Sequence, residues 1–335
     1  MPSHERLRVA VFLGGDSAER DVSLASGREV LAALRQRGHE VVAVDPARGV
    51  LGPEEEAALS ADVGLLPPAD PQEGTRRSPI DVLRAEAVRS ADVAFVALHG
   101  GAGEDGRLQA AFELEGIRYT GSGPLGCAVA MDKAIAKRLM RAAGVPTPDW
   151  LMAPAEEDAV ADALGFPVIV KASKQGSTVG LTLVREPAGL EDAIAEGFRH
   201  DDEVMIERYV PGRELTVAVV GDQAFPPGEI VPRHEIFDYE CKYQPGMAEE
   251  VFPADLAPDL AAEAERLALA THRALKLGGY SRVDFRLDTG GRLWCLEANT
   301  APGMTAASLL PKAGRAAGLS FPELCERICR LALAW

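Results

Sequence analysis

The chain has 335 residues, 47% of them hydrophobic and 26% charged, which is enough to bury a sizeable core in about two domains. Its formal net charge of −16 argues against nucleic acid and an anionic membrane surface as partners, because both require concentrated Lys and Arg. A nucleotide substrate stays possible, since magnesium and a few local cations can outweigh distant surface charge.

The cysteines and the N-terminus favour a cytoplasmic location. The odd number of cysteines has no zinc-type pairing, so we expect reduced, mostly packed thiols. They are Cys127, Cys241, Cys295, Cys325 and Cys329. Residues 1–7 are polar and lead straight into a strand, which predicts no signal peptide, and no apolar run approaches the roughly 18 residues of a membrane span.

The first part of the chain alternates strands and helices. Strands over 8–13 and 40–44 flank a helix over 23–35, and a buried strand over 93–98 ends at a glycine-rich turn. Residues 51–80 are acidic and Pro-rich and are expected to be an excursion from this unit. The alternation indicates an α/β fold with a parallel sheet.

After residue 123 the pattern becomes a mixture of strands and helices. A helix carrying Met131-Asp-Lys133 is expected to run to Gly144, followed by a linker over 145–148. Further expected elements are strands over 167–171 and 204–209, a helix over about 256–276, a hairpin over 282–298 and a closing helix over 321–334.

The hairpin carries the most informative polar pattern. If Leu287 pairs with Arg292 across the turn 288–291, then Arg282 lies opposite Glu297. Strand alternation then places four polar residues on one face, and their apolar neighbours face a core. The polar set is Arg282, Asp284, Glu297 and Asn299, with Asp284 opposite Cys295; the apolar set is Val283, Phe285, Leu296 and Ala298.

Three oxygen ligands on one rigid face suit magnesium, which prefers hard oxygens and keeps waters and phosphates as its remaining ligands. Asp284, Glu297 and Asn299 are therefore candidate metal ligands. The alternative is an amphipathic hairpin with a solvated polar face.

A glycine- and serine-rich loop after a strand points to phosphate chemistry. In 171–180 the glycines let the backbone approach phosphates, while Lys171 and Lys174 supply charge. The chain contains no G-x-x-x-x-G-K-[ST] motif, and 14–18 does not match G-x-G-x-x-G, so neither a P-loop nor a dinucleotide fold is supported. A loop of this kind alone is more often only a loop; its occurrence together with the hairpin carboxylates favours a nucleotide site.

Together these motifs resemble D-alanine–D-alanine ligases over nearly the whole chain, from about residue 8 to 333. The residues that carry the resemblance are Leu98-His-Gly, Gly103-Glu-Asp-Gly106, Tyr119-Thr-Gly-Ser-Gly123, Met131-Asp-Lys133, Lys171 with Gly176-Ser-Thr-Val-Gly180, Asp238-Tyr-Glu-Cys-Lys-Tyr243 and Glu297-Ala-Asn-Thr-Ala-Pro-Gly-Met-Thr305. The resemblance implies the ATP-grasp fold, with an N-terminal parallel-sheet subdomain (1–121), a central subdomain (122–210) and a C-terminal subdomain (211–335) carrying a mobile loop at about 234–253.

The resemblance also implies ATP and Mg²⁺ as cofactors, with two Mg²⁺ ions and with Mn²⁺ able to substitute. The implied ATP contacts are Lys133, Lys171, Ser177, the adenine segment Glu207-Arg208-Tyr209-Val210, the ribose partner Glu214, and Lys242 from the mobile loop. Asp284, Glu297 and Asn299 match the metal ligands, and Arg282 and the Gly303 N–H match the groups that stabilise the tetrahedral intermediate.

For the amino-acid substrates, the resemblance implies Glu19 and His99 around the first D-alanine, and Ser308 and Leu309 at the carboxylate of the second. Ser177, Tyr243 and Glu19 are implied to form a hydrogen-bonded link across a loop that closes over the site and excludes water. Without the resemblance, structural interpretations are favoured: Glu19 as a helix start, His99 as a structural hydrogen bonder and Tyr243 as a surface aromatic. The implied assembly is a homodimer.

The implied activity is ligation of two D-alanines, with ATP converted to ADP and phosphate, for peptidoglycan synthesis. Departures from the family pattern are Ala172 in place of Pro, Phe237 in place of Tyr, and Thr305-Ala-Ala-Ser308 in place of Ser-His before the final Ser. Ala307 leaves the acceptor open to D-serine, D-lactate or another acid, whereas Tyr243 favours an amine acceptor. A small-molecule kinase and a non-catalytic nucleotide-binding relative are the alternatives from other classes.

Overall fold

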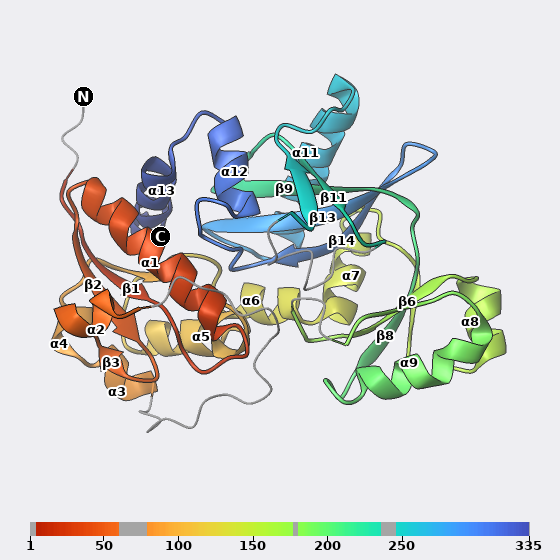
Figure 1. The fold of residues 1–335 in the computed structure, drawn as a ribbon, viewed down its shortest axis with the longest axis horizontal. Helices are drawn as coiled ribbons and strands as arrows, with labels where there is room; N and C mark the ends of the chain where they lie inside the picture. Colours follow the sequence, from red (N-terminus) through yellow and green to blue (C-terminus); the bar gives the residue numbers. More distant parts are fainter. Residues whose placement is uncertain (1–4, 60–78, 177–179, 236–245, 335) are drawn as a thin grey trace.

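The fold is described by a computed structural model over residues 5–59, 79–176, 180–235 and 246–334. Ser177, Lys242, Tyr243 and most of the acidic segment 51–80 lie outside these ranges. The described part of the chain forms three β-sheets, with helices packed between and around them (Figure 1).

The first sheet has the strand order β3-β2-β1-β4. Its strands are β1 (Arg8–Phe12), β2 (Glu40–Asp45), β3 (Gly49–Val50) and β4 (Val93–Val96). β1 pairs in parallel with both β2 and β4, which confirms the parallel sheet expected from the sequence. Because β2 and β4 lie on opposite sides of β1, the loops at the carboxyl ends of β1 and β4 diverge, which is where parallel sheets commonly bind ligands.

Short helices surround this sheet, and α1 is the longest of them. They are α1 (Arg20–Gln36), α2 (Pro53–Ala57), α3 (Pro79–Leu83), α4 (Glu86–Arg89), α5 (Arg107–Leu114) and the 3-10 turn η1 (Gly101–Gly103).

The second sheet is antiparallel, in the order β5-β8-β6-β7, and lies at the lower right of Figure 1. Its elements are β5 (Trp150–Met152), α8 (Glu157–Ala163), β6 (Val168–Ala172), β7 (Thr182–Val184), η2 (Pro187–Gly189), α9 (Leu190–Gly197) and β8 (Val204–Arg208). Val168, Val170 and Ile206 share a buried cluster with residues of α8 and α9. Lys171 and Glu207, at the alternating positions, therefore face away from these helices.

The third sheet has the order β12-β11-β9-β13-β14, with β10 paired to β9. Its elements are β9 (Gly212–Val220), β10 (Gln223–Ala224), β11 (Gly228–Pro232), β12 (Ala248–Val251), α11 (Pro258–Ala274), β13 (Tyr280–Asp288), β14 (Leu293–Asn299), α12 (Leu309–Ala316) and α13 (Phe321–Leu333). One face packs Leu215, Val283 and Phe285 against Leu267 of α11, so polar residues at the alternating positions lie on the opposite face.

The predicted continuous helix through Met131-Asp132-Lys133 is wrong. The chain forms α6 (Pro124–Met131) and α7 (Lys133–Ala142), because Asp132 has an extended backbone with φ −82° and ψ 98°. The Asp132 side chain accepts a hydrogen bond of 2.9 Å from the N–H of Ile135 and so caps α7. Lys133 is thereby the first residue of α7.

The predicted register of the hairpin is also wrong, because Leu287 pairs with Leu293 rather than Arg292 at the turn and because β14 contains a β-bulge beyond it. The observed pairs are Arg282–Asn299, Val283–Ala298, Asp284–Glu297, Phe285–Cys295, Arg286–Trp294 and Leu287–Leu293. Leu296 is the extra residue between Cys295 and Glu297, and it therefore has no partner position on β13.

The bulge changes which residues of β14 face the core. Cys295 is fully buried beside Phe285, whereas Glu297, only two residues later, lies on the polar face. Strict alternation would place Cys295 and Glu297 on the same face of the sheet and Leu296 in the core. In the structure the core contains Cys295 instead of Leu296. The predicted polar set still shares one face, because all four residues lie on the same side of the bulge.

The two ends of the chain meet in the fold. α13 packs on α1, and Arg37 Nε lies 2.6 Å from Glu326 Oε2 between them.

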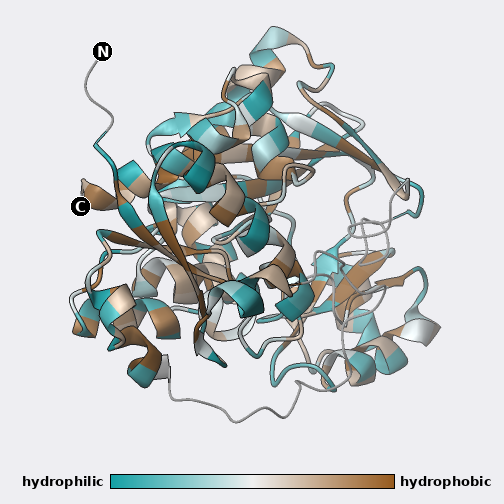
Figure 2. Cartoon of the chain, turned by 60° about the vertical axis from the view of Figure 1, so that its left-hand side comes forward, coloured by the Kyte–Doolittle hydropathy of each residue, from teal (hydrophilic) through white to brown (hydrophobic). Residues whose placement is uncertain are grey.

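Figure 2 shows apolar strands covered by helices whose polar residues face outward. Across the ranges given above, none of the helices combines the length and the apolar character that crossing a membrane requires.

Candidate active site

Asp284 is the centre of a polar cluster on the third sheet. Its Oδ1 accepts from Thr216 Oγ1 at 2.7 Å and from Arg282 Nε at 2.9 Å. Its Oδ2 accepts from Arg282 Nη2 at 2.8 Å and from Asn299 Nδ2 at 3.0 Å. The structure thus brings Arg282, Asp284 and Asn299 into contact, and it adds Thr216, which lies opposite Asp284 on β9.

Glu297 lies directly across the strand ladder from Asp284. Two like charges at such positions repel each other, so the pair requires cations nearby. Arg282 forms an ion pair with Asp284, and Lys133 Nζ lies 3.5 Å from Glu297 Oε2. No cluster of three His, Cys, Asp or Glu side chains suited to a metal occurs in the described residues. The third polar side chain beside Asp284 and Glu297 is the amide of Asn299, which is not one of these residue types.

Lys133 links this face to the glycine- and serine-rich loop. Its Nζ donates to the carbonyl of Gln175 at 2.7 Å, and its N–H donates to the carbonyl of Ser173 at 3.2 Å. The start of α7 is therefore fixed against the loop after β6 while its first side chain reaches Glu297 on β14. The loop and the hairpin, predicted separately, meet at Lys133.

Lys171 and Glu207 form a buried ion pair on the second sheet. Lys171 Nζ lies 2.8 Å from Glu207 Oε2, and Lys137 of α7 holds the other oxygen at 2.5 Å. Burial opposes ionisation of Glu207, but Lys137 and Lys171 hold its pKa below the usual range. Burial lowers the pKa of Lys137 to about 8, against the opposing effect of Glu207.

Arg286 joins the end of the second sheet to the third. Its Nε donates to the carbonyl of Val210 at 3.0 Å, and its Nη1 lies 3.2 Å from Glu214 Oε2. Arg286 and Glu214 pair across β13 and β9, on the same face as Asp284. Arg208 instead contacts Asp149, with Nη2 2.5 Å from Oδ2. Val210 and Glu214 are thus held close together by Arg286.

Glu19 lies between the turn after β4 of the first sheet and the glycine- and serine-rich loop after β6 of the second sheet. Its N–H donates to Ser17 Oγ at 3.2 Å, just before α1 begins. A Cβ placed on Gly100 would come within 2.9 Å of Glu19 Oε2, and one placed on Gly176 would come within 3.5 Å. The carboxylate therefore lies against both the turn after β4 and the glycine- and serine-rich loop.

His99 is buried and held by neighbours on both sides of its ring. Its Nε2 lies 2.9 Å from Ser26 Oγ of α1, and its Nδ1 lies 3.7 Å from Glu104 Oε1. Burial raises the pKa of Glu104, against the opposing hydrogen bond to His99. Ser26 Oγ also accepts from the N–H of Met304 at 3.2 Å, so it joins His99 to the segment that contains Gly303.

Gly303 and Ser308 are in close contact. A Cβ on Gly303 would lie 2.7 Å from Ser308 Oγ and 3.2 Å from Ser308 Cβ, so a larger residue would force the Ser308 side chain or the Gly303 backbone to shift. Ser308 is the N-cap of α12, and its Oγ lies 2.8 Å from Thr305 Oγ1. Leu309 packs its side chain beside Ile230, so only its backbone is able to serve the site.

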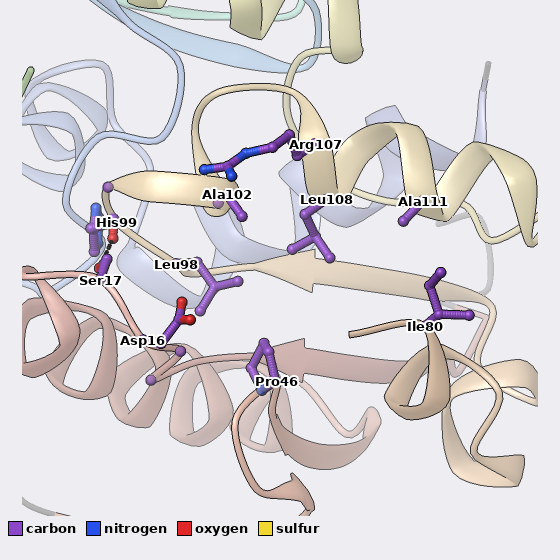
Figure 3. A pocket seen from close by; sticks show the side chains of 14 residues that line it. Asp16, Ser17, Pro46, Ile80, Leu98, His99, Ala102, Arg107, Leu108 and Ala111 are labelled. Atoms are coloured by element: carbon purple, nitrogen blue, oxygen red, sulfur yellow. Dashed lines mark hydrogen bonds between the residues drawn. The ribbon is translucent and has the colours of Figure 1, made fainter. Parts of the chain in front are cut away.

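A cavity of about 340 Å³ opens beside these loops, at the carboxyl ends of β1 and β4 (Figure 3). Its walls are mainly apolar and include Leu98 and Leu108, with the side chain of Asp16 at one end. Ser17 Oγ donates to the carbonyl of His99 at 2.6 Å at this end of the cavity. The cavity adjoins the loop that holds Glu19.

Some residues of this site have no clear sequence signal. Thr216 and Arg286 become recognisable only once β9 is known to pair with β13. Ser26 and Lys137 are single polar residues on helices, although Lys137 follows Lys133 by one helical turn, which predicts a shared helix face. The predicted contacts of Ser177, Lys242 and Tyr243 lie outside the described residues.

The three sheets, with Lys133 of α7 facing Glu297 on β14 and Lys171 of β6 facing Glu207 on β8, define an ATP-grasp enzyme. Two family models match most of the chain: "D-ala D-ala ligase N-terminus" over residues 8–122 and "D-ala D-ala ligase C-terminus" over residues 139–330. The chain belongs to the D-alanine–D-alanine ligase family.

Relatives and solved structures agree with this assignment. The D-alanine–D-alanine ligase of Geobacter sulfurreducens is 43% identical over 328 residues, covering 96% of this chain and 92% of the relative. That of Syntrophobacter fumaroxidans is 42% identical over 340 residues, covering 99% of each. The crystal structure of the Bacillus anthracis ligase complexed with ATP is 31% identical, with a TM-score of 0.76, covering 98% of this chain and 97% of that one.

Proposed function

We propose that this chain joins two D-alanine molecules to D-alanyl-D-alanine and converts ATP to ADP and phosphate, as a step in peptidoglycan precursor synthesis. The carboxylate of the first D-alanine attacks the γ-phosphorus and releases ADP, which gives an acyl phosphate. The amine of the second D-alanine then attacks the acyl carbon, and collapse of the oxyanion with loss of a proton from nitrogen releases phosphate.

The position of Lys133 carries this proposal. Its ammonium lies between the carbonyl of Gln175, at 2.7 Å, and Glu297 Oε2, at 3.5 Å. A cation shared by a glycine-rich loop and the Glu297 carboxylate suits a polyphosphate, which needs both backbone donors and neutralising charge. The same site brings Glu19 against Gly176 of that loop, which supports an amino-acid site beside the phosphates.

For the nucleotide, we assign Lys133, Lys171, Ser177 and Lys242 to the phosphates, Glu207 to Val210 to adenine and Glu214 to ribose. The buried Glu207–Lys171 pair and the contact of Arg286 with both Val210 and Glu214 support one continuous binding surface. Arg208 points to Asp149, so its contribution is assigned to the backbone.

For the metal, we assign Asp284, Glu297 and Asn299 to Mg²⁺, two ions being expected and Mn²⁺ being able to substitute. The donor set fits, because all three side chains offer hard oxygens and because two carboxylates face each other across the ladder. Bound Mg²⁺ would supply charge neutralisation on the phosphate oxygens.

For the amino-acid substrates, we assign Glu19 and His99 to the first D-alanine, and the Ser308 hydroxyl and Leu309 N–H to the second carboxylate. The N-terminus of α12 favours an anion at this point. Arg282 and the Gly303 N–H are assigned to the developing oxyanion, and the contact of Gly303 with Ser308 supports their action on the same reacting group.

The remaining assignments follow the family resemblance. They are three subdomains (1–121, 122–210 and 211–335), a closing loop at about 234–253 that carries Tyr243, a homodimer, and a cytoplasmic location. Sedimentation of the purified protein at several concentrations tests the homodimer, and a monomer throughout would contradict it.

The test of the activity is phosphate release in the presence of ATP and Mg²⁺, with and without D-alanine, followed by mass spectrometry of the product. Ligation predicts phosphate release that depends on D-alanine and a dipeptide in equal amount. A phosphorylated small molecule without free phosphate would identify a kinase instead, and an absence of ATP turnover would identify a binding protein.

The acceptor is tested separately, because Thr305-Ala306-Ala307-Ser308 departs from the family pattern. Ala307 is exposed, while Ala306 is fixed by Glu29 of α1 and by Arg315, whose Nη2 donates to the Ala306 carbonyl at 2.9 Å. We expect D-alanine to be preferred over D-serine and D-lactate when all three compete with D-alanine as donor. A dominant mixed product would contradict a strict D-alanine acceptor.

A further inference from the structure

Lys137 contacts the buried Glu207 from α7. It is fully buried on α7, one helical turn after Lys133. Its Nζ donates to Thr147 Oγ1 at 2.6 Å and to Glu207 Oε1 at 2.5 Å, and it lies 5.1 Å from the centre of the Trp150 ring. A buried ammonium is costly unless it is paired and hydrogen-bonded, so these contacts explain how Lys137 is tolerated.

Glu207 is shared between two lysines, one on each oxygen. Lys137 holds Oε1, and Lys171 Nζ lies 2.8 Å from Oε2. With Lys137 present, the three groups carry one net positive charge. Without Lys137, Glu207 and Lys171 would neutralise each other, and Lys171 would offer an incoming phosphate little attraction.

We propose that Lys137 is a positioning residue for the nucleotide: it neutralises and orients Glu207 so that the charge of Lys171 remains available to the ATP phosphates. This inference rests on the proposed nucleotide site. Lys137 itself does not touch the nucleotide in this account. Its effect passes through Glu207, whose pKa the two lysines keep low.

The role predicts a dependence on phosphate charge that a purely structural role lacks. Each lost unit of charge weakens binding in proportion to the charge on the ligand. Removal of the Lys137 charge should therefore weaken ATP binding strongly and adenosine binding little. A packing defect near Glu207 would weaken both ligands by similar factors, because both present the same adenine.

The experiment measures dissociation constants of ATP and adenosine by calorimetry for the wild type and for Lys137→Met, Lys137→Gln and Lys137→Arg. We expect the ATP constant to rise on the order of 10-fold in the Met and Gln variants, with a change below about 3-fold for adenosine. Lys137→Arg retains the charge and should keep the wild-type preference for ATP. In turnover, the Met and Gln variants should raise the KM for ATP more than they lower kcat.

Thr147→Val is the matched control, because it removes the other hydrogen bond of Lys137 and leaves every charge in place. It should leave the ratio of the two dissociation constants unchanged. Lys137→Gln, which can still hydrogen-bond to Thr147 and Glu207, serves if the Met variant does not fold. Equal weakening of ATP and adenosine, or none, would overturn the role of Lys137. Failure of the wild type to bind ATP would instead overturn the proposed function.

Discussion

At the scale of single residues, the site pairs buried and half-buried carboxylates with nearby cations. Asp284 and Glu297 face each other across β13 and β14, and Arg282 and Lys133 lie on either side of them. The arrangement is unfavourable for an isolated hairpin, since like charges at paired positions repel. It suits a site that gathers phosphates and cations, and this leads to a prediction for Glu297.

Glu297→Gln should lower kcat on the order of 100-fold or more, because an amide keeps the size of the side chain and removes one charge from the proposed metal site. The melting temperature should stay near the wild-type value, because the repulsion with Asp284 is also relieved. Glu191→Gln, an exposed carboxylate on α9, is the control and should be silent in both measurements. Turnover of Glu297→Gln at the wild-type rate would remove Glu297 from the metal site.

Gly303→Ala should also lower kcat, on the order of 100-fold, because the new Cβ would meet Ser308 Oγ at 2.7 Å and displace either the Ser308 hydroxyl or the Gly303 N–H from its place in the site. Gly189→Ala is matched to it: the nearest atom to a Cβ there is 3.6 Å away, and the residue is exposed. Steady-state kinetics of both variants checks this. If both behave like the wild type, the contact of Gly303 with Ser308 is not needed for catalysis.

At the scale of elements, the sequence predicts the framework of the site better than its details. The alternation of strands and helices predicts the parallel first sheet, and hairpin alternation places Arg282, Asp284, Glu297 and Asn299 on one face. The register is missed because the turn is one residue longer than the sequence predicts, so that Leu287 pairs with Leu293, and because a β-bulge has no signature in the composition of β14. The bulge places Cys295 rather than Leu296 in the core beside Phe285, and a choice of this kind depends on the tertiary packing.

Two further elements are missed for related reasons. The break at Asp132 follows from a side-chain cap, and the apolar and basic residues around it read as one helix. α12 begins at Leu309 after a stretch of small residues with little periodicity, so only its cap at Ser308 marks it. The sequence therefore names the residues of the site, while their contacts depend on elements brought together from distant segments.

α11 packs on the face of the third sheet opposite the site, and its His272 makes the stability of the fold dependent on pH. His272 Nδ1 lies 2.7 Å from Ser281 Oγ of β13, and burial lowers the pKa of His272 to about 4. The folded state thus resists protonation, while the unfolded chain takes up a proton near the ordinary value of 6.5. This contribution to stability is present above about pH 6.5 and is lost as the pH falls toward 4.

The loss amounts to about 3 kcal/mol at most. Denaturant unfolding between pH 7 and 4 should show a smaller loss of stability in His272→Gln than in the wild type. His200→Gln, on the exposed surface near α9, is the control and should follow the wild type. Identical pH profiles for His272→Gln and the wild type would contradict the assignment.

At the scale of the whole molecule, the site lies where the three sheets converge. The first sheet brings Glu19 and His99, the second brings Lys171 and Glu207, and the third brings the hairpin. Ser26 of α1 contacts both His99, which follows β4 of the first sheet, and Met304, in the segment after β14 of the third sheet. α13 also packs on α1. This convergence accounts for a reaction that needs a nucleotide and two amino acids in one place.

The central claim is that the carboxylate of one D-alanine is activated by transfer of the γ-phosphoryl group. It is tested most directly with D-alanine labelled with ¹⁸O in its carboxylate, by mass spectrometry of the phosphate released. The acyl phosphate route predicts one ¹⁸O atom in each phosphate and unlabelled ADP, in equal amount with the dipeptide. Unlabelled phosphate would show that water attacks ATP, and it would contradict the activation step on which the account depends.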